Sequence, residues 1–286
     1  MSRKIAKSKI VDMTVGSTMR HLLLFAAPLL VGNVFQQLYN LVDSLIVGRF
    51  VGANALAAVG TCGSISFLFF ALCSGLANGV GVIVAQKFGA KKEKDIRITI
   101  GNSIYVISGI ALVVTVLGIV FPGSILRLIG TPQSILSDAT RYLQIVSAGI
   151  VGVAVFNGVS AIMRSLGDSK TPLYFLIVSS LINVSLDLLF VIVFGLGVFG
   201  VAVATVIAQY ASAIACLIYA IKKVEYFKLT LSEMKPNREV IETAFILGIP
   251  MSLQMSIIAV SCMALQRVVN SFGETVIAAF TITNRI

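Results

Sequence analysis

Long apolar runs separated by short polar clusters dominate the sequence. A helix needs roughly 20 mostly apolar residues to cross the hydrocarbon core of a bilayer, and most of these runs reach that length. The pattern predicts seven membrane-spanning helices and the beginning of an eighth, which is too short to cross and suggests that the sequence is part of a longer protein. The expected spans are 22–47, 56–86, 98–121, 137–163, 173–194, 197–221 and 244–270, and the eighth begins near Glu274 and continues to Ile286.

Composition and charge placement support a multi-pass membrane protein. Hydrophobic residues make up 57% of the chain and charged residues 12%, whereas roughly 25% of a soluble domain is charged. The net charge of +10 would suit a nucleic-acid partner, but we expect none, because the lysines and arginines lie in short clusters between apolar runs. Most of these clusters fall on one side of the predicted membrane, so the positive-inside rule predicts a plasma (inner) membrane protein with a cytoplasmic N-terminus.

Two segments of the chain, residues 28–60 and 250–281, resemble each other. Each starts with a proline at the head of an apolar run and ends in a glycine followed by small residues. An even number of spans separates them, so both enter the membrane in the same direction, as in the parallel repeats of several transporters. The alternative is a chance likeness between two apolar spans.

The predicted fold is therefore an all-α integral membrane bundle with a six-span lobe and the start of a second, parallel copy. Its expected parts are a cytoplasmic basic N-terminal segment (1–21), the N-terminal six-span lobe (22–221), a cytoplasmic linker (222–243) and the start of the C-terminal lobe (244–286).

Only two acidic residues, Asp43 and Asp187, fall well inside apolar runs. Placing an aspartate at the centre of a spanning helix costs on the order of 2.5–3.5 kcal/mol, and such residues usually mark ion or proton paths. Oxygen-bearing side chains share the same helix faces, which suits a hard cation such as Na⁺ or proton exchange. The alternative is that these polar groups only join helices. The accompanying residues are Asn33, Gln36, Tyr39 and Asn40 near Asp43, Ser180 and Asn183 near Asp187, and Thr205 on the sixth span.

Several smaller features have simpler expectations. Gly75 and Gly79 form a GxxxG pattern, which predicts close helix packing. Asp168 and Lys170 are expected to be solvated in a short cytoplasmic turn. The four cysteines are expected to be small buried residues. Three phenylalanines in the second span are expected to face lipid or the core and not to form a drug-binding surface. These residues are Cys62, Cys73, Cys216 and Cys262, and Phe67, Phe69 and Phe70.

Four stretches, in this order, resemble the multidrug and toxic compound extrusion (MATE) family of transporters. They are residues 28–60 (including VDSLIVGRFVGANALAAVG), AQKFGA at 85–90, MRSLGD at 163–168 through Pro172, and GLGVFGVAVAT at 195–205. The resemblance implies twelve spans in two six-helix lobes facing a central cavity. It also implies export of amphipathic, often cationic, small molecules in exchange for Na⁺ or H⁺, with no other cofactor. We expect the full-length protein to be a monomer in the lipid bilayer.

The resemblance also assigns candidate roles to individual residues. It places a cation- or proton-binding site in the first lobe, with the possible Na⁺ ligands Asp43 and Asp187, and a helix hinge at Pro28. Some relatives carry a glutamate on the seventh span, but residues 255–259 here contain no acid, which favours the site in the first lobe. The other implied members of that site are Asn183, Thr205, Asn157 and Tyr39.

Two other functions fit a pair of intramembrane acids less well. A lipid-linked flippase of the wider superfamily should have a basic cavity for pyrophosphate, yet few lysines or arginines lie inside the predicted spans. An intramembrane aspartyl protease would be expected to carry Gly-x-Gly-Asp around one acid, whereas Val184, Ser185 and Leu186 precede Asp187. A secondary active exporter is therefore the leading hypothesis, and we expect no enzymatic activity.

Overall fold

The computed structural model describes residues 18–284, and these residues form helices without a strand. Most of the predicted N-terminal segment 1–21 and the last two residues of the eighth run lie outside this range. The all-α prediction is confirmed. The helices are α1 (Thr18–Ile46), α2 (Ala53–Gly89), α3 (Glu93–Val120), α4 (Pro122–Leu128), α5 (Gln133–Ala148), α6 (Ile150–Ser165), α7 (Lys170–Leu188), α8 (Gly197–Lys223), α9 (Arg238–Asn270) and α10 (Glu274–Thr283), with π-helical turns at Val47–Val51 and Leu189–Val193 and a 3₁₀ turn at Glu225–Phe227.

The predicted spans agree with these helices to within a few residues at most ends. Within the described range, five helices are individually long and apolar enough to cross a bilayer. They are α2, α3, α7 with the π-helical turn that follows it, α8 and α9. The predicted fourth span differs, because it consists of two helices, α5 and α6, that meet at a bend of 44° and only together are long and apolar enough to cross a bilayer. The helix α1 is 29 residues long, but it is not among the helices whose composition is apolar enough to cross a bilayer.

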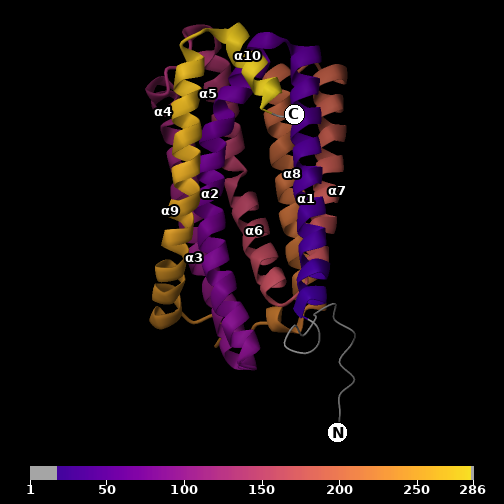
Figure 1. Cartoon of the computed structure of the whole chain (residues 1–286), viewed down its shortest axis with the longest axis vertical. Helices are drawn as coiled ribbons and strands as arrows, with labels where there is room; N and C mark the ends of the chain where they lie inside the picture. The colour runs from indigo at the N-terminus through magenta and orange to yellow at the C-terminus, as the bar shows by residue number, and fades with distance from the viewer. Residues whose placement is uncertain (1–17, 285–286) are drawn as a thin grey trace.

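The helices form an elongated bundle with α6 near its middle (Figure 1). The helix α2 packs most extensively against α9 and also against α6, whereas α1 packs mainly against α7. The connections α2–α3, α6–α7 and α8–α9 all lie at the end of the bundle where α1 begins (Figure 1). These connections contain the basic clusters of the sequence, so we refer to this end as the basic end.

The two segments that resemble each other in sequence also share local structure. Both α1 and α9 contain a proline in a continuous helix, at Pro28 and Pro250, and both run in the same direction (Figure 1). Each is followed by a glycine with positive φ that begins the next helix, namely Gly52 (φ 120°, ψ 173°) and Gly273 (φ 86°, ψ 173°). Glycine adopts this backbone without a steric penalty. The shared geometry supports a structural repeat.

The GxxxG pattern of α2 is in close contact with α9. A Cβ atom added to Gly79 would lie 2.6 Å from Cα of Gly248, and one added to Gly75 would overlap the backbone of Ser252. Such distances are shorter than ordinary carbon contacts, so the two backbones meet only because the side chains are absent. The prediction of close packing is confirmed, and the structure identifies the partner as the first helix of the second copy.

The expectation that Asp168 is solvated is wrong. Its side chain is buried, with Oδ1 accepting hydrogen bonds from the backbone N–H groups of Thr171 (3.0 Å) and Lys170 (3.2 Å) and Oδ2 accepting from Thr171 Oγ1 (2.6 Å). The two backbone donors, Lys170 and Thr171, carry the first N–H groups of α7, which have no partner within the helix. Gly167, with φ of 91°, turns the chain between α6 and α7 and directs Asp168 toward them.

Replacing Asp168 with alanine should therefore destabilise the protein by about 1–3 kcal/mol, because two N–H groups and a hydroxyl lose a buried acceptor. The change is measured as a lower midpoint of thermal unfolding in detergent. Asp138→Ala is the matched control, since Asp138 is exposed on α5. Equal midpoints for the two variants would contradict this role of Asp168.

The cysteine prediction is correct for three of four residues. Cys62, Cys73 and Cys216 are buried, but Cys262 is exposed. The difference arises because Cys262 lies on α9, and most of the apolar length of this helix is not covered by other parts of the described chain.

Candidate functional site

A cavity of about 240 Å³ lies between α1, α2, α5, α6 and α8. Asp43 borders it from α1, and aromatic side chains of α2 border it from the opposite helix. Among the described residues, none of the side chains that line it is lysine or arginine. The lining residues are Tyr39, Asn40, Asp43, Val59, Gly63, Ser66, Phe67, Phe69, Phe70, Tyr142, Val146, Ser147, Ile150, Val153, Thr205 and Gln209.

The two predicted intramembrane acids meet beside this cavity. Asp43 is 9% exposed and Asp187 is fully buried, and their carboxyl groups lie within hydrogen-bonding reach of each other. The packing of α1 against α7 brings them together. Two ionised carboxylates this close repel each other, and a proton or a cation between them removes the repulsion.

Asn183 lies one helical turn before Asp187 and connects it to α8. When the amide is oriented to satisfy both neighbours, Nδ2 donates to Asp187 Oδ2 (2.9 Å) and Oδ1 accepts from the backbone N–H of Thr205 (3.1 Å). The Thr205 hydroxyl donates to Val201 O (3.0 Å) on its own helix. In this arrangement the Asn183 amide positions the Asp187 carboxyl group, and its own oxygen is already engaged.

Two tyrosines complete the surroundings of Asp43. Tyr39, predicted from the sequence, lines the cavity one turn before Asp43. Tyr142 on α5 also lines it, is 8% exposed, and lies close to Asp43 and Tyr39. Tyr142 could not be predicted from the sequence, because a tyrosine in an apolar run is common and no neighbouring residue distinguishes it.

The structure does not bring every predicted residue to this cavity: Asp43 lines it, whereas Asp187 and Asn183 are not among the lining residues. Asn157 on α6 donates to Val153 O (2.8 Å) one turn back and is absent from the lining. Of the polar stripe on α1, Asn40 lines the cavity, whereas Asn33 is exposed and Gln36 is half-buried outside the lining. Pro28 lies just over four turns before Asp43 on the same helix, so its predicted hinge role is separate from the carboxyl pair.

The bend between α5 and α6 forms one wall of the cavity. It lies at Gly149, where an added Cβ atom would overlap Oε1 of Gln209. The carbonyl of Ala148 at the bend accepts a hydrogen bond from the Tyr210 hydroxyl (2.7 Å) on α8. Irregular backbone at membrane depth is tolerated where protein groups or a cavity satisfy it, and here α8 supplies such a group.

The donor set suits a small monovalent cation or a proton. Two carboxyl groups supply oxygen ligands, and hard cations such as Na⁺ prefer oxygen. Two facing carboxyl groups can also share a hydrogen bond when one carries a proton. The residues present therefore fit Na⁺ or a proton, and either would neutralise the repulsion between Asp43 and Asp187.

Comparison with known proteins decides the family. The family model described as MatE matches residues 28–189, which is more than half of the chain. The chain belongs to the MATE family. It is 32% identical over 277 residues to the probable multidrug resistance protein YoeA of Bacillus subtilis (strain 168), covering 94% of this chain and 60% of that protein. It is 34% identical over 280 residues to the probable multidrug resistance protein YpnP of the same organism, covering 97% of this chain and 62% of that protein.

Solved structures of MATE transporters share the fold. The inward-facing conformation of a multidrug resistance MATE family transporter of the MOP superfamily aligns with a TM-score of 0.81 and 26% sequence identity, covering 87% of this chain and 57% of that chain. A MATE crystal structure in the straight conformation aligns with a TM-score of 0.84 and 25% identity, covering 98% of this chain and 63% of that chain. The present chain thus spans about 60% of the length of its curated MATE relatives, and it is a multi-pass membrane protein of a transporter family.

Proposed function

We propose that the protein takes part in exporting amphipathic, often cationic, compounds across the plasma membrane in exchange for Na⁺ or H⁺. The observation that carries this proposal is the buried carboxyl pair, Asp43 and Asp187, at the edge of a cavity in a chain of the MATE family. Relatives described as multidrug resistance proteins support drug export. The active form is proposed to be a monomer containing both lobes, with no nucleic-acid partner.

Orientation follows from the charge distribution. The basic clusters gather at the end of the bundle where α1 begins (Figure 1). The positive-inside rule supports placing this end, and with it the N-terminus, in the cytoplasm. The carboxyl pair then lies toward the outer side, where Asp43 is near the end of α1 and Asp187 is near the end of α7.

The carboxyl pair couples ion and drug through its charge. With the ion absent, the repulsion between Asp43 and Asp187 favours separating α1 from α7, and the free negative charge attracts a cationic drug to the cavity. With the ion bound, the charge is neutralised and the drug is held less well. Exchange requires that the ion bind the two conformations unequally, and α1 is suited to respond because it packs mainly against α7. Bending at Pro28 would be the accompanying change in α1.

The lining of the cavity favours an aromatic cation over a pyrophosphate. Phe67 and Phe70 stack with their ring centroids 6.5 Å apart and an interplanar angle of 17°, and both line the cavity that Asp43 borders. Aromatic faces attract cations. The described lining residues include no lysine or arginine, so the pyrophosphate group of a flippase substrate would have no cationic partner there.

Phe67→Ala should weaken binding of a planar cation such as ethidium by about fivefold, since an aromatic contact contributes roughly 1 kcal/mol. Binding is measured by fluorescence anisotropy of the purified full-length protein. Phe194→Ala is the matched control, because Phe194 stacks on Phe190 (6.1 Å) away from the cavity. Equal weakening by both substitutions would show that the effect is not specific to the cavity.

Ethidium efflux with Na⁺ and pH varied separately tests the proposed function as a whole. Efflux driven by a gradient of one of these ions is expected, and its absence under both gradients would contradict the proposal. An intramembrane aspartyl protease would also use a close pair of acids, so a cleavage assay on a model transmembrane substrate separates that function from transport. We expect no cleavage.

A further inference from the structure

The linker between α8 and α9 is held firmly against α3. Arg97 donates to Lys228 O (3.2 Å), Tyr105 donates to Met234 O (2.9 Å), and Asn102 accepts from the Asn237 N–H (2.7 Å). The carbonyl of Glu233 would lie 2.5 Å from a Cβ atom added to Gly101, so the linker passes directly over that glycine. The depth of the linker in the bilayer is therefore set by the depth of residues 101–105 of α3.

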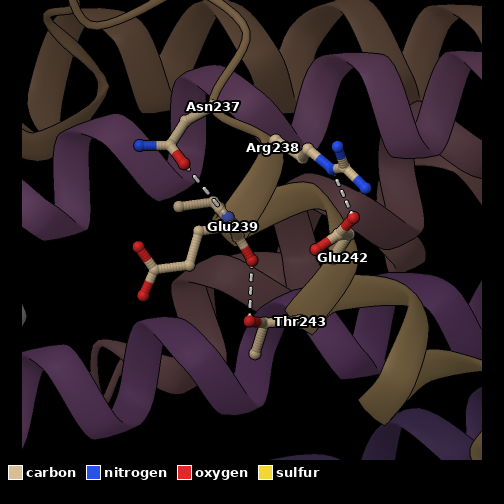
Figure 2. Close-up of polar contacts among 6 residues, drawn as sticks. Asn237, Arg238, Glu239, Glu242 and Thr243 are labelled. Carbon is tan, nitrogen blue, oxygen red and sulfur yellow. Dashed lines mark hydrogen bonds and ion pairs between the residues drawn. The ribbon is translucent and has the colours of Figure 1, made fainter.

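The linker also determines where α9 begins. The side chain of Asn237 accepts a hydrogen bond from Val240 N–H (3.3 Å), and an ion pair between Arg238 and Glu242 (2.6 Å) follows on the first turn (Figure 2). Thr243 donates to Glu239 O (2.7 Å) in the same turns (Figure 2). Because these side chains are charged, the first turns of α9 are expected to lie in the headgroup layer and not in the hydrocarbon core.

The length of α3 gives an independent estimate of this depth. Its 28 residues extend about 42 Å at 1.5 Å per residue, whereas the hydrocarbon core is about 30 Å thick. The excess projects at the basic end, because the first turn holds Glu93 and Asp95 and the last turn holds no charge. Measured from Val120, the core then ends close to Gly101. Both estimates place the linker segment next to Gly101 at the boundary between hydrocarbon and headgroups.

A compact turn in this segment presents one apolar side chain outward. Glu233 Oε2 accepts hydrogen bonds from Thr230 N–H (2.7 Å) and Thr230 Oγ1 (2.8 Å), which closes the turn. These hydrogen bonds lower the pKa of the Glu233 carboxyl group, so it stays ionised and keeps the turn closed at neutral pH. Leu231 at the tip is 86% exposed, the most exposed large apolar side chain of the described chain. The exposed lysines Lys228 and Lys235 flank the turn.

We propose that this turn is a lipid anchor, in which Leu231 inserts among the headgroups of the leaflet at the basic end while Lys228 and Lys235 contact anionic lipid phosphates. An apolar tip between basic residues is a combination that binds the membrane interface. The turn connects the six-span lobe to α9, so the anchor would hold the start of the second copy at a fixed depth. The proposal depends on the membrane insertion of the chain and not on its transport activity.

Tryptophan fluorescence can test the depth of the turn directly. The 286-residue sequence contains no tryptophan, so Leu231→Trp places one reporter in it, with any tryptophan elsewhere in the full-length protein replaced by phenylalanine before reconstitution in phosphatidylcholine–phosphatidylglycerol vesicles. Lipids brominated on the acyl chain near the headgroup should quench it at least about twofold, as expected for an interfacial side chain. Ala90→Trp is the control, since the exposed Ala90 lies in the α2–α3 turn beyond the charged start of α3. It should be quenched much less, and equal or absent quenching at Leu231→Trp would overturn the proposal.

A second measurement avoids the preference of tryptophan itself for interfaces. Leu231→Ser should leave the midpoint of thermal unfolding unchanged in detergent, because the exposed side chain packs against little protein. In the anionic vesicles it should lower the midpoint by a few °C, the scale of a modest stability change. Lys228→Gln combined with Lys235→Gln should reduce the dependence of that midpoint on phosphatidylglycerol. Midpoints in vesicles that match those of the unsubstituted protein would overturn the lipid anchor.

Discussion

Asp187→Asn should reduce the rate of ion-driven drug export by the full-length transporter at least about tenfold, which corresponds to roughly 1.4 kcal/mol in coupling. Asparagine has nearly the same shape but no negative charge, so it neither repels Asp43 nor holds a proton or Na⁺ with the same strength. The buried carboxyl group also accepts a hydrogen bond from Asn183, and an asparagine oxygen can still accept it. The loss should therefore concern coupling and not folding.

Ethidium efflux from cells or vesicles under an imposed ion gradient measures this effect, with the amount of protein in the membrane determined in parallel. Asp138→Asn is the matched control, because Asp138 is an exposed acid on α5, and it should export at the rate of the unsubstituted protein. Normal ion-driven export by Asp187→Asn at equal expression would remove Asp187 from the coupling mechanism.

Gly79→Leu should strongly destabilise the protein although Gly79 lies outside the cavity. The added side chain would start 2.6 Å from the backbone of Gly248, so α9 would have to move away from α2 along their most extensive contact. Overpacking of a tight contact typically costs about 1–3 kcal/mol and occasionally more. We expect a lower midpoint of thermal unfolding, by several °C, and less protein in the membrane.

Gly109→Leu tests whether leucine in a spanning helix is itself harmful. Apart from the nearby backbone of α3 itself, no atom of the described residues lies within 4 Å of a Cβ atom added to Gly109, which is exposed on α3, so this variant should behave like the unsubstituted protein. A smaller substitution, Gly79→Ala, should give an intermediate loss. If Gly79→Leu unfolds at the same temperature as Gly109→Leu, the contact between α2 and α9 is not as close as the structure indicates.

The apolar runs alone predicted most helix ends to within a few residues, because a bilayer imposes a minimum length on every span. The bend at Gly149 was missed, since both α5 and α6 are apolar and a single glycine does not distinguish a bend from a helix-packing site. The role of Asp168 was misjudged for a related reason. The N–H groups that donate to its carboxylate come close to it only in the folded turn after Gly167.

The candidate site was predictable to the extent that its members break a pattern. Asp43 and Asp187 stand out because an acid in an apolar run is costly, and the structure places them side by side. Tyr142 does not break any pattern, so only the three-dimensional structure shows that it borders the same cavity. Asn157 had the expected polarity, but its amide is engaged with its own helix at Val153.

The coupling ion and the exported cation should compete for the charge of Asp43 and Asp187. Equilibrium binding of ethidium to the purified full-length protein tests it most directly, measured against pH without Na⁺ and against Na⁺ at fixed pH. For the unsubstituted protein the account predicts weaker binding as protons or Na⁺ increase, and for Asp43→Asn it predicts weak binding that no longer responds to either. Ethidium affinity that ignores both ions, or an ion response that persists unchanged in Asp43→Asn, would contradict it.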